Sequence, residues 1–221
     1  MSAGNGDESR VATARVFWGR HSAAMPPFED TETPVSPESL HLSVNAVIEI
    51  VKRARGEELP CLVVGGHAVI LYQIPRFTRD LDFLIPEEAV DRWLDFLLRL
   101  SYSVFHRTGA FIQLEPATPG SLPPVDLMLV DKQTWGKLVA EAQEREAGEG
   151  LSLPVPHPWH LIAMKLAAAK SATRRSSAVD WSDILELLQT CKIDLGDPEF
   201  QKVVIQFGGE EALQRMQEEQ R

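Results

Sequence analysis

Two aspartates separated by one leucine, Asp80 and Asp82, constrain the fold of this chain more than any other feature of its sequence. Apolar Leu81 and Phe83 alternate with them, and successive side chains of a β-strand point to opposite faces. Both carboxylates are therefore expected on one face of a strand, where they repel each other unless a cation lies between them. Mg²⁺ takes oxygen ligands and retains waters and substrate phosphates, so the pair predicts a Mg²⁺ site, with Mn²⁺ as an alternative ion.

A glycine pair, Gly65 and Gly66, lies upstream, between the apolar run Cys61–Val64 and an apolar segment that begins at His67. This order predicts a strand, a glycine turn and a helix ahead of the acidic strand. Glycines let backbone N–H groups approach a ligand closely, and a helix start carries a partial positive charge, so this turn is expected to hold a triphosphate. Two roles stay open for His67: contact with a phosphate, or a structural group with satisfied hydrogen bonds.

A third acid, Asp126, lies inside the apolar run Val125–Val130. Aspartate is almost never fully buried without a partner, so this strand is expected to supply the third carboxylate. Glu115 is the rival candidate, but Pro116 and the loop after it indicate an exposed edge. The sequence thus predicts that Asp80, Asp82 and Asp126 together form the catalytic, metal-binding set.

The combination of an apolar strand, Gly-Gly, the spacer His67–Arg79, Asp-x-Asp and a later apolar-Asp-apolar strand resembles the nucleotidyltransferase superfamily related to DNA polymerase beta. Within it, the segment Arg76-Phe77-Thr78-Arg79-Asp80-Leu81-Asp82-Phe83 is most similar to the nucleotidyltransferase toxins of abortive-infection and toxin–antitoxin systems. Those toxins often carry an Arg-x-Thr-x-Asp-Leu-Asp core. The resemblance covers roughly residues 59–189.

A second segment is similar to the same toxins, which have a Lys-Leu helix, an arginine and then Lys-Asp-x-x-Asp. Here the helix carries Lys165, the arginine is Arg174, and the acids are Asp180 and Asp183, while Val179 replaces the second lysine. Lys165 is expected either to point toward a phosphate or to place its ammonium in water. The two acids are expected to pair with Lys165 or Arg174 on the nucleotide side, and the alternative for Asp180 is to cap a helix start.

The resemblance implies an α/β (α+β) fold, with a mixed sheet flanked by helices and a C-terminal helical part. It implies metal-dependent transfer of a nucleoside monophosphate from a nucleoside triphosphate to a hydroxyl, with RNA as acceptor, such as the 3′ end of a transfer RNA. A toxin of this kind would be neutralised by an antitoxin protein. The catalytic residues would be Asp80, Asp82, Asp126 and Lys165, and the substrate-binding residues Gly65, Gly66, Arg76, Thr78, Arg174 and Asp183.

Two other functions stay open. The net charge of −10 argues against broad binding to a nucleic-acid backbone and suits a cationic acceptor such as an aminoglycoside. A local basic groove formed by Lys165, Lys170, Arg174 and Arg175 would still suit a nucleotide or an RNA end. The more distant alternative is a non-catalytic binding module in which the acids pair with Arg76 and Arg79.

The chain divides by composition into an arm at residues 1–38, a nucleotidyltransferase core at 39–150 and a helical region at 151–221. Two cysteines without paired spacing, and the lack of an apolar signal core or a run of about 20 apolar residues, predict a cytoplasmic protein without a membrane span. Apolar periodicity predicts helices starting at Ser43, Pro86, Pro158 and near Asp180, and strands at Tyr102–Phe105 and Ala110–Glu115.

Overall fold

The computed structural model describes residues 37–148, 150–169 and 177–219. Most of the predicted N-terminal arm lies outside the described residues, as do Lys170, Arg174 and Arg175. The chain forms two compact units, of which the first ends at Pro156 and the second begins at His157.

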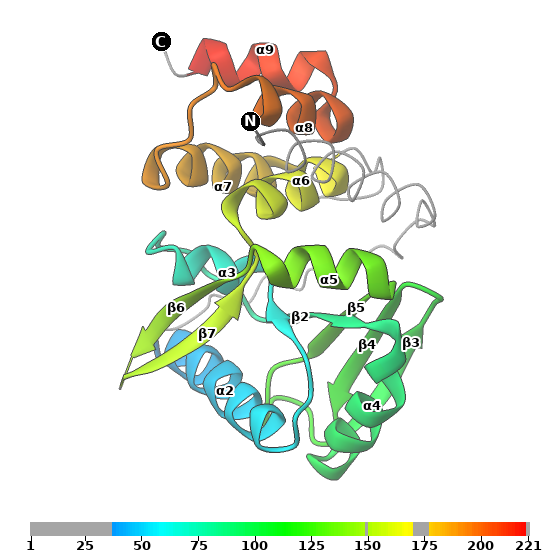
Figure 1. The fold of residues 1–221 in the computed structure, drawn as a ribbon. Coiled ribbons are helices and arrows are strands. Elements are labelled where there is room, and N and C mark those ends of the chain that lie inside the picture. The colour runs from blue at the N-terminus through cyan, green and yellow to red at the C-terminus, as the bar shows by residue number, and fades with distance from the viewer. Residues whose placement is uncertain (1–36, 149, 170–176, 220–221) are drawn as a thin grey trace. The chain divides into compact units, whose positions relative to one another are not determined.

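The first unit contains a mixed five-stranded sheet with the strand order β1-β2-β5-β4-β3 (Figure 1). The central pair β2 and β5 is parallel, and the other neighbouring pairs are antiparallel. This arrangement confirms the predicted mixed sheet. The strands are β1 (Leu62–Val63), β2 (Leu81–Pro86), β3 (Tyr102–Arg107), β4 (Phe111–Pro116) and β5 (Val125–Val130).

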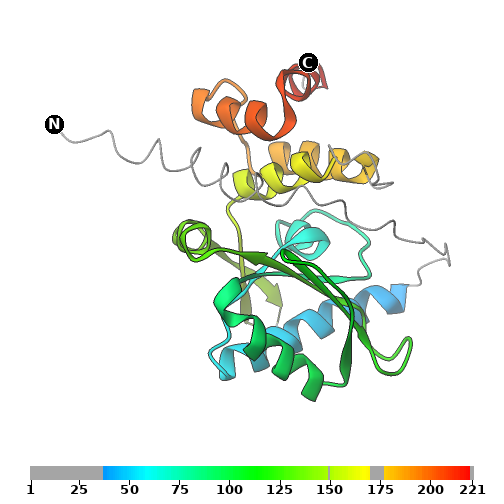
Figure 2. The same ribbon diagram turned by 90° about the vertical axis from the view of Figure 1, so that its right-hand side faces the viewer.

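Aromatic packing shows which face of the sheet is covered by helix α4. The ring of Phe83 on β2 stacks on Trp93 of α4 with centroids 5.6 Å apart, and the Trp93 indole donates a hydrogen bond to the Pro60 carbonyl at 3.0 Å. Helices α2 and α4 lie on the same side of the sheet (Figures 1 and 2). Since neighbours along a strand alternate, Asp82 points to the opposite face. The helices of this unit are α2 (Pro37–Gly56), α3 (Gly65–Leu71), the 3₁₀ turn η1 (Glu87–Ala89), α4 (Val90–Arg99) and α5 (Lys132–Ala140).

A two-stranded hairpin follows α5 and was not predicted from the sequence. Its strands are β6 (Gln143–Gly148) and β7 (Leu151–Val155), and the expected boundary at residue 150 falls in its turn. Gly148 and Gly150 both have positive φ, at 104° and 72°, which suits a tight turn. Because β6 consists mainly of polar residues, it lacks the apolar alternation that identifies a strand.

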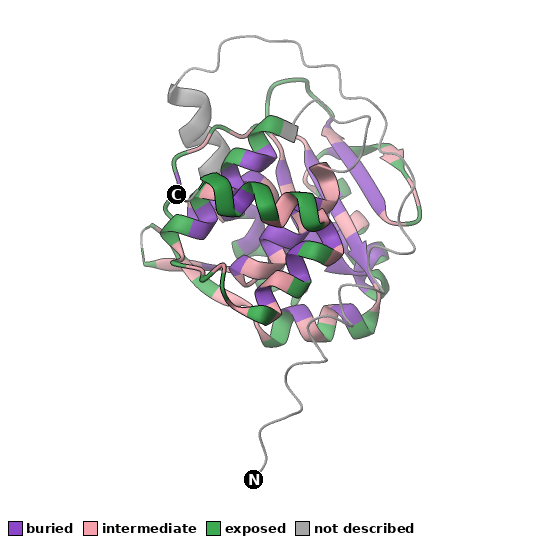
Figure 3. Ribbon diagram, turned by 90° about the horizontal axis from the view of Figure 1, so that it is seen from above, coloured by how far each residue is buried: buried purple, intermediate pink, exposed green. Residues whose placement is uncertain are grey.

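The second unit is helical, as predicted. Trp159 at the start of α6 packs on Phe200 of α8 with ring centroids 5.3 Å apart, and Gly208 leaves room for the side chain of Leu166. Asp197 caps α8 by accepting a hydrogen bond from the backbone N–H of Glu199 at 2.8 Å. Exposed residues alternate with buried ones along the helices, as expected of amphipathic helices (Figure 3). The helices are α6 (Pro158–Ala169), α7 (Ser177–Thr190), α8 (Pro198–Gly208) and α9 (Glu210–Glu219).

The part of the chain that the structure describes contains no helix long and apolar enough to cross a membrane. Neither cysteine forms a disulfide: Cys61 is buried ahead of β1, and Cys191 is half-buried after α7. Burial raises the pKa of the Cys61 thiol to about 12.

The two thiols are therefore expected to differ sharply in reactivity. At pH 8, Ellman's reagent should modify one thiol per native chain rapidly, because Cys61 is both inaccessible and un-ionised. In a Cys191→Ser variant the rapid phase should disappear, and the remaining thiol should react only after unfolding in guanidinium. Two rapid thiols in the native protein would contradict the described burial of Cys61.

Candidate active site

Asp82 and Asp126 lie directly opposite each other on the parallel strands β2 and β5. Paired residues of neighbouring strands point to the same face, and neighbouring strands are about 4.8 Å apart. Asp126 is only 5% exposed and Asp82 is half-buried. The structure thus places two of the three predicted acids side by side, on the face opposite to Phe83 and Trp93.

The glycine pair packs against two of the predicted site residues. A Cβ atom on Gly65 would lie 1.9 Å from Oδ2 of Asp82, and one on Gly66 would lie 2.6 Å from both Cβ and Oγ1 of Thr78. Gly65 also has a φ of +59°, in the left-handed region that favours glycine. The backbone N–H of Val64 donates a hydrogen bond to the Asp82 carbonyl at 3.0 Å. The glycines are therefore required by the packing of the protein itself, a reason that sequence reasoning did not supply.

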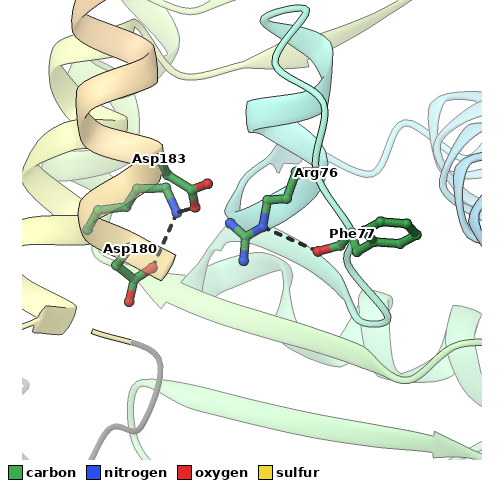
Figure 4. Close-up of polar contacts among 5 residues, drawn as sticks. Arg76, Phe77, Asp180 and Asp183 are labelled. Carbon is green, nitrogen blue, oxygen red and sulfur yellow. Dashed lines mark hydrogen bonds and ion pairs between the residues drawn. The ribbon is translucent and has the colours of Figure 1, made fainter. Parts of the chain in front are cut away.

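Exposure alternates along the segment that leads into β2. Arg76, Thr78 and Asp80 are half-buried, whereas Phe77 and Arg79 are exposed. The side chains of Arg76 and Phe77 point in different directions, and Nε of Arg76 donates a hydrogen bond to the Phe77 carbonyl at 3.4 Å (Figure 4). The alternation places Arg76, Thr78, Asp80 and Asp82 on one side of the segment. Asp80 itself lies just before the first residue of β2.

His67 is buried in α3, with an exposed fraction of 2%. Burial lowers the pKa of its imidazole to about 4; the positive charge of Arg76 adds to this effect, and a hydrogen bond with the Asp80 backbone opposes it. The ring is therefore neutral at pH 7. Of its two open roles, these contacts favour a structural group that fixes the backbone ahead of Asp82.

Two polar residues that sequence reasoning missed continue the line of acids across the sheet. Gln113 on β4 lies opposite Asp126, and His106 on β3 lies opposite Gln113. A register shift between Val104 and His106 brings His106 rather than Phe105 to this position. Gln113 interrupts apolar neighbours as Asp126 does, so the same argument would have found it. We call Asp82, Asp126, Gln113 and His106 the polar row.

Glu115, the rival third acid, lies two residues beyond Gln113 on β4 and opposite Ser103 of β3. It is half-buried and shares the face of the polar row, because residues two apart on a strand point the same way. It is not opposite Asp126 or Asp82. Asp126 therefore has the better position next to Asp82.

The predicted site residues of the second unit form a buried ion cluster. Nζ of Lys165 lies 2.5 Å from Oδ2 of Asp183 and 3.3 Å from Oδ1 of Asp180, and all three residues are buried. Figure 4 shows the two aspartates on α7 turned toward the same ammonium. The ammonium of Lys165 is thus held by two carboxylates and joins α6 to α7. Arg174, which was predicted with them, lies outside the described residues.

The carboxylates of the first unit fit a divalent cation that is also held by waters and substrate phosphates. In the described ranges, no group of three or more His, Cys, Asp or Glu side chains is arranged to hold a metal ion. Mg²⁺, however, is usually bound by one or two carboxylates together with waters and substrate phosphates. The paired Asp82 and Asp126 provide such carboxylates, and Gly65 leaves the space that the carboxylate of Asp82 occupies. Asp80 stays a predicted third ligand.

Comparison with known protein families and with curated protein sequences finds no match. Solved structures do match. The antibiotic-resistance factor ANT(2'')-Ia in solution is 16% identical with a TM-score of 0.59, and the match covers 82% of this chain and all of that chain. A crystal structure of ANT(2")-Ia in complex with adenylyl-2"-tobramycin is 16% identical with a TM-score of 0.51, over 80% and 98% of the two chains.

An antigenic nucleotidyltransferase-like protein from Paracoccidioides brasiliensis is also 16% identical, with a TM-score of 0.51, over 82% of this chain and 95% of that one. At this level of identity the likeness concerns the fold. The chain has the fold of these nucleotidyltransferases, which confirms the predicted fold class.

Replacing Gly65 by alanine should destabilise the first unit. The positive φ and the overlap of the new methyl group with the Asp82 carboxylate should together cost at least about 2 kcal/mol of unfolding free energy. Gly136→Ala is the matched control, because nothing lies within 4 Å of its added Cβ. Urea unfolding followed by circular dichroism measures both. Equal stability of the two variants would show that Gly65 is not packed on Asp82.

Replacing Lys165 by methionine should destabilise the second unit more than a surface substitution. Two buried carboxylates would lose their counterion, which should cost about 3 to 5 kcal/mol. Lys202→Met is the control, because Lys202 pairs with Glu199 while more than half exposed, and should cost less than about 1 kcal/mol. Urea midpoints that coincide for the two variants would contradict the buried cluster.

Proposed function

We propose that this protein is an enzyme that transfers a nucleoside monophosphate from a nucleoside triphosphate to a hydroxyl group, with Mg²⁺ or Mn²⁺ as cofactor. One observation carries the proposal: Asp82 and Asp126 are opposite each other on parallel strands, and the carboxylate of Asp82 packs against Gly65. Two adjacent carboxylates repel each other and favour a cation at that point. The fold shared with known nucleotidyltransferases supports the same conclusion.

Asp82 and Asp126 would hold the metal ion, with Asp80 as the predicted third ligand. When bound, the divalent ion supplies positive charge that stabilises the reacting phosphate oxygens and the pyrophosphate leaving group. Asp126 would also accept the proton of the acceptor hydroxyl. In the transfer, the hydroxyl oxygen bonds to the α-phosphorus, the bond to the bridging oxygen breaks, and pyrophosphate leaves with the electron pair.

The nucleotide would be bound on the side of Asp82 where the glycine pair lies. Thr78 and the backbone of Gly65 and Gly66 are together there, because Thr78 packs against Gly66 and Asp82 against Gly65. Arg76 shares that side of the chain and provides a positive charge for the triphosphate. Lys165 and Asp183 we assign instead to holding α6 and α7 together, since the charge of the lysine is already compensated.

The acceptor we favour is a small molecule with several hydroxyls and amines. A net charge of −10 attracts a cationic acceptor, and ANT(2")-Ia, whose fold this chain shares, is known in complex with adenylyl-2"-tobramycin.

RNA is the second candidate, with an antitoxin as protein partner. The observation in its favour is the Arg76-x-Thr78-x-Asp80-Leu81-Asp82 segment, which is similar to the core of nucleotidyltransferase toxins.

The test is transfer of label from each α-³²P nucleoside triphosphate, with Mg²⁺, into a panel of amino sugars that includes tobramycin and into total RNA. Asp82→Asn and Asp126→Asn keep the side-chain volume and should each lower the rate by at least about a hundredfold. Asp95→Asn on α4 is the matched control, because it makes the same chemical change at an exposed position. Its rate should equal that of the native chain.

Three other results would change the conclusion. Label in RNA alone would favour the toxin-like function. Equal rates for Asp82→Asn and the native chain would remove the proposed role of the acids. If the native chain neither transfers label nor binds a nucleotide, the remaining function would be that of a non-catalytic binding module.

A further inference from the structure

Two sets of side chains extend from Asp82 in different directions. One set follows the chain into β2 and consists of Arg76, Thr78 and Asp80, on the half-buried side of that segment. The other is the polar row, which crosses the sheet from β2 to β3 at nearly constant register. With neighbouring strands about 4.8 Å apart, the row spans roughly 14 Å from Asp82 to His106. A substrate at Asp82 and Asp126 can therefore extend in two directions.

The chemistry of the two directions differs. The first carries a guanidinium, a hydroxyl and the glycine backbone, which suit phosphate oxygens. The row beyond Asp126 carries a carboxamide and an imidazole, and Glu115 adds a carboxylate on the same face. Arg107 lies opposite Ile112, so it points to the other face of the sheet. The row therefore places no lysine or arginine next to Asp126.

Displacement at phosphorus requires the attacking and leaving oxygens to be roughly in line. If pyrophosphate leaves toward Thr78 and the glycine pair, the attacking hydroxyl must approach from the opposite side of Asp82. That side is occupied by Asp126 and, beyond it, by Gln113 and His106. The direction of attack thus coincides with the polar row.

We infer that Gln113 and His106 form the binding site of the acceptor, and that the acceptor is a small hydroxylated molecule bearing amines. This inference rests on the proposed nucleotidyl transfer. Gln113 offers two donors and an acceptor to hydroxyl and amine groups. Nε2 of His106 is buried and hydrogen-bonds to no group in the described part of the chain, so a hydroxyl or amine of the acceptor would satisfy it. A polynucleotide is bound chiefly through phosphates and needs lysine or arginine, which the row lacks.

The experiment separates the Michaelis constants of the two substrates. The acceptor probes are tobramycin and the same panel of amino sugars. Gln113→Leu and His106→Ala should each raise KM for the amino sugar by about five- to tenfold, because hydrogen bonds are lost. Both should leave KM for the nucleoside triphosphate within about twofold. Arg76→Gln should show the reverse pattern, because it loses a phosphate contact.

Gln133→Leu, at an exposed position of α5, is the matched control for the loss of a carboxamide and should change neither constant. Circular dichroism checks that each variant folds. His106 is half-buried on an edge strand, so His106→Ala is expected to fold and carries the test if Gln113→Leu unfolds.

Several outcomes would overturn the inference while the proposed function stands. One is a rise in KM for the nucleotide equal to that for the amino sugar, and another is no change in either constant. Transfer by the native chain to RNA, or to no member of the panel although nucleotide is bound, would exclude the amine-bearing class. Failure of the native chain to bind any nucleoside triphosphate, measured by equilibrium dialysis, would instead end the proposed function and this inference with it.

Discussion

The parallel pairing of β2 with β5 is the constraint on which the rest of the site depends. It places Asp82 opposite Asp126, and two ionised carboxylates side by side on neighbouring strands repel each other. A sheet that needed only stability would put apolar residues at both positions, as it does on the other face, where Phe83 stacks on Trp93. The apolar face of β2 thus supports a face on which two carboxylates lie side by side.

The glycine pair connects that sheet to the segment before it. Gly65 makes room for the Asp82 carboxylate and Gly66 for the Thr78 side chain, so two consecutive backbone positions bring together residues four apart in the sequence. His67 follows directly, neutral and buried, with a hydrogen bond to the Asp80 backbone. Three consecutive residues therefore position the Arg76–Asp82 segment. These contacts explain why the glycine pair and the Asp-x-Asp segment occur together in the sequence.

Sequence reasoning predicted what depends on local pattern. The alternation around Asp82 and the apolar run around Asp126 identified the acids, and the bounds of β5, Val125–Val130, agree with the predicted run. It missed His106, whose place depends on pairing between strands and on a register shift after Val104 that no local pattern encodes. It also missed Gln113, although its apolar neighbours follow the same pattern as those of Asp126. The β6–β7 hairpin was missed because polar residues dominate β6. Strand pairing thus accounts for the omission of His106, and polar composition accounts for that of the hairpin.

The distribution of charge follows from the same architecture. A chain with a net charge of −10 that binds a triphosphate needs local positive charge, and Arg76 supplies one such charge beside the acids. Lys165, which the sequence also predicts for that task, is held by Asp180 and Asp183 in the second unit. Two carboxylates around one ammonium leave that cluster with an excess negative charge. In the proposed function, the triphosphate would obtain its compensation from Arg76 and from a bound divalent ion, while the net negative charge would disfavour polyanions and favour a cationic acceptor.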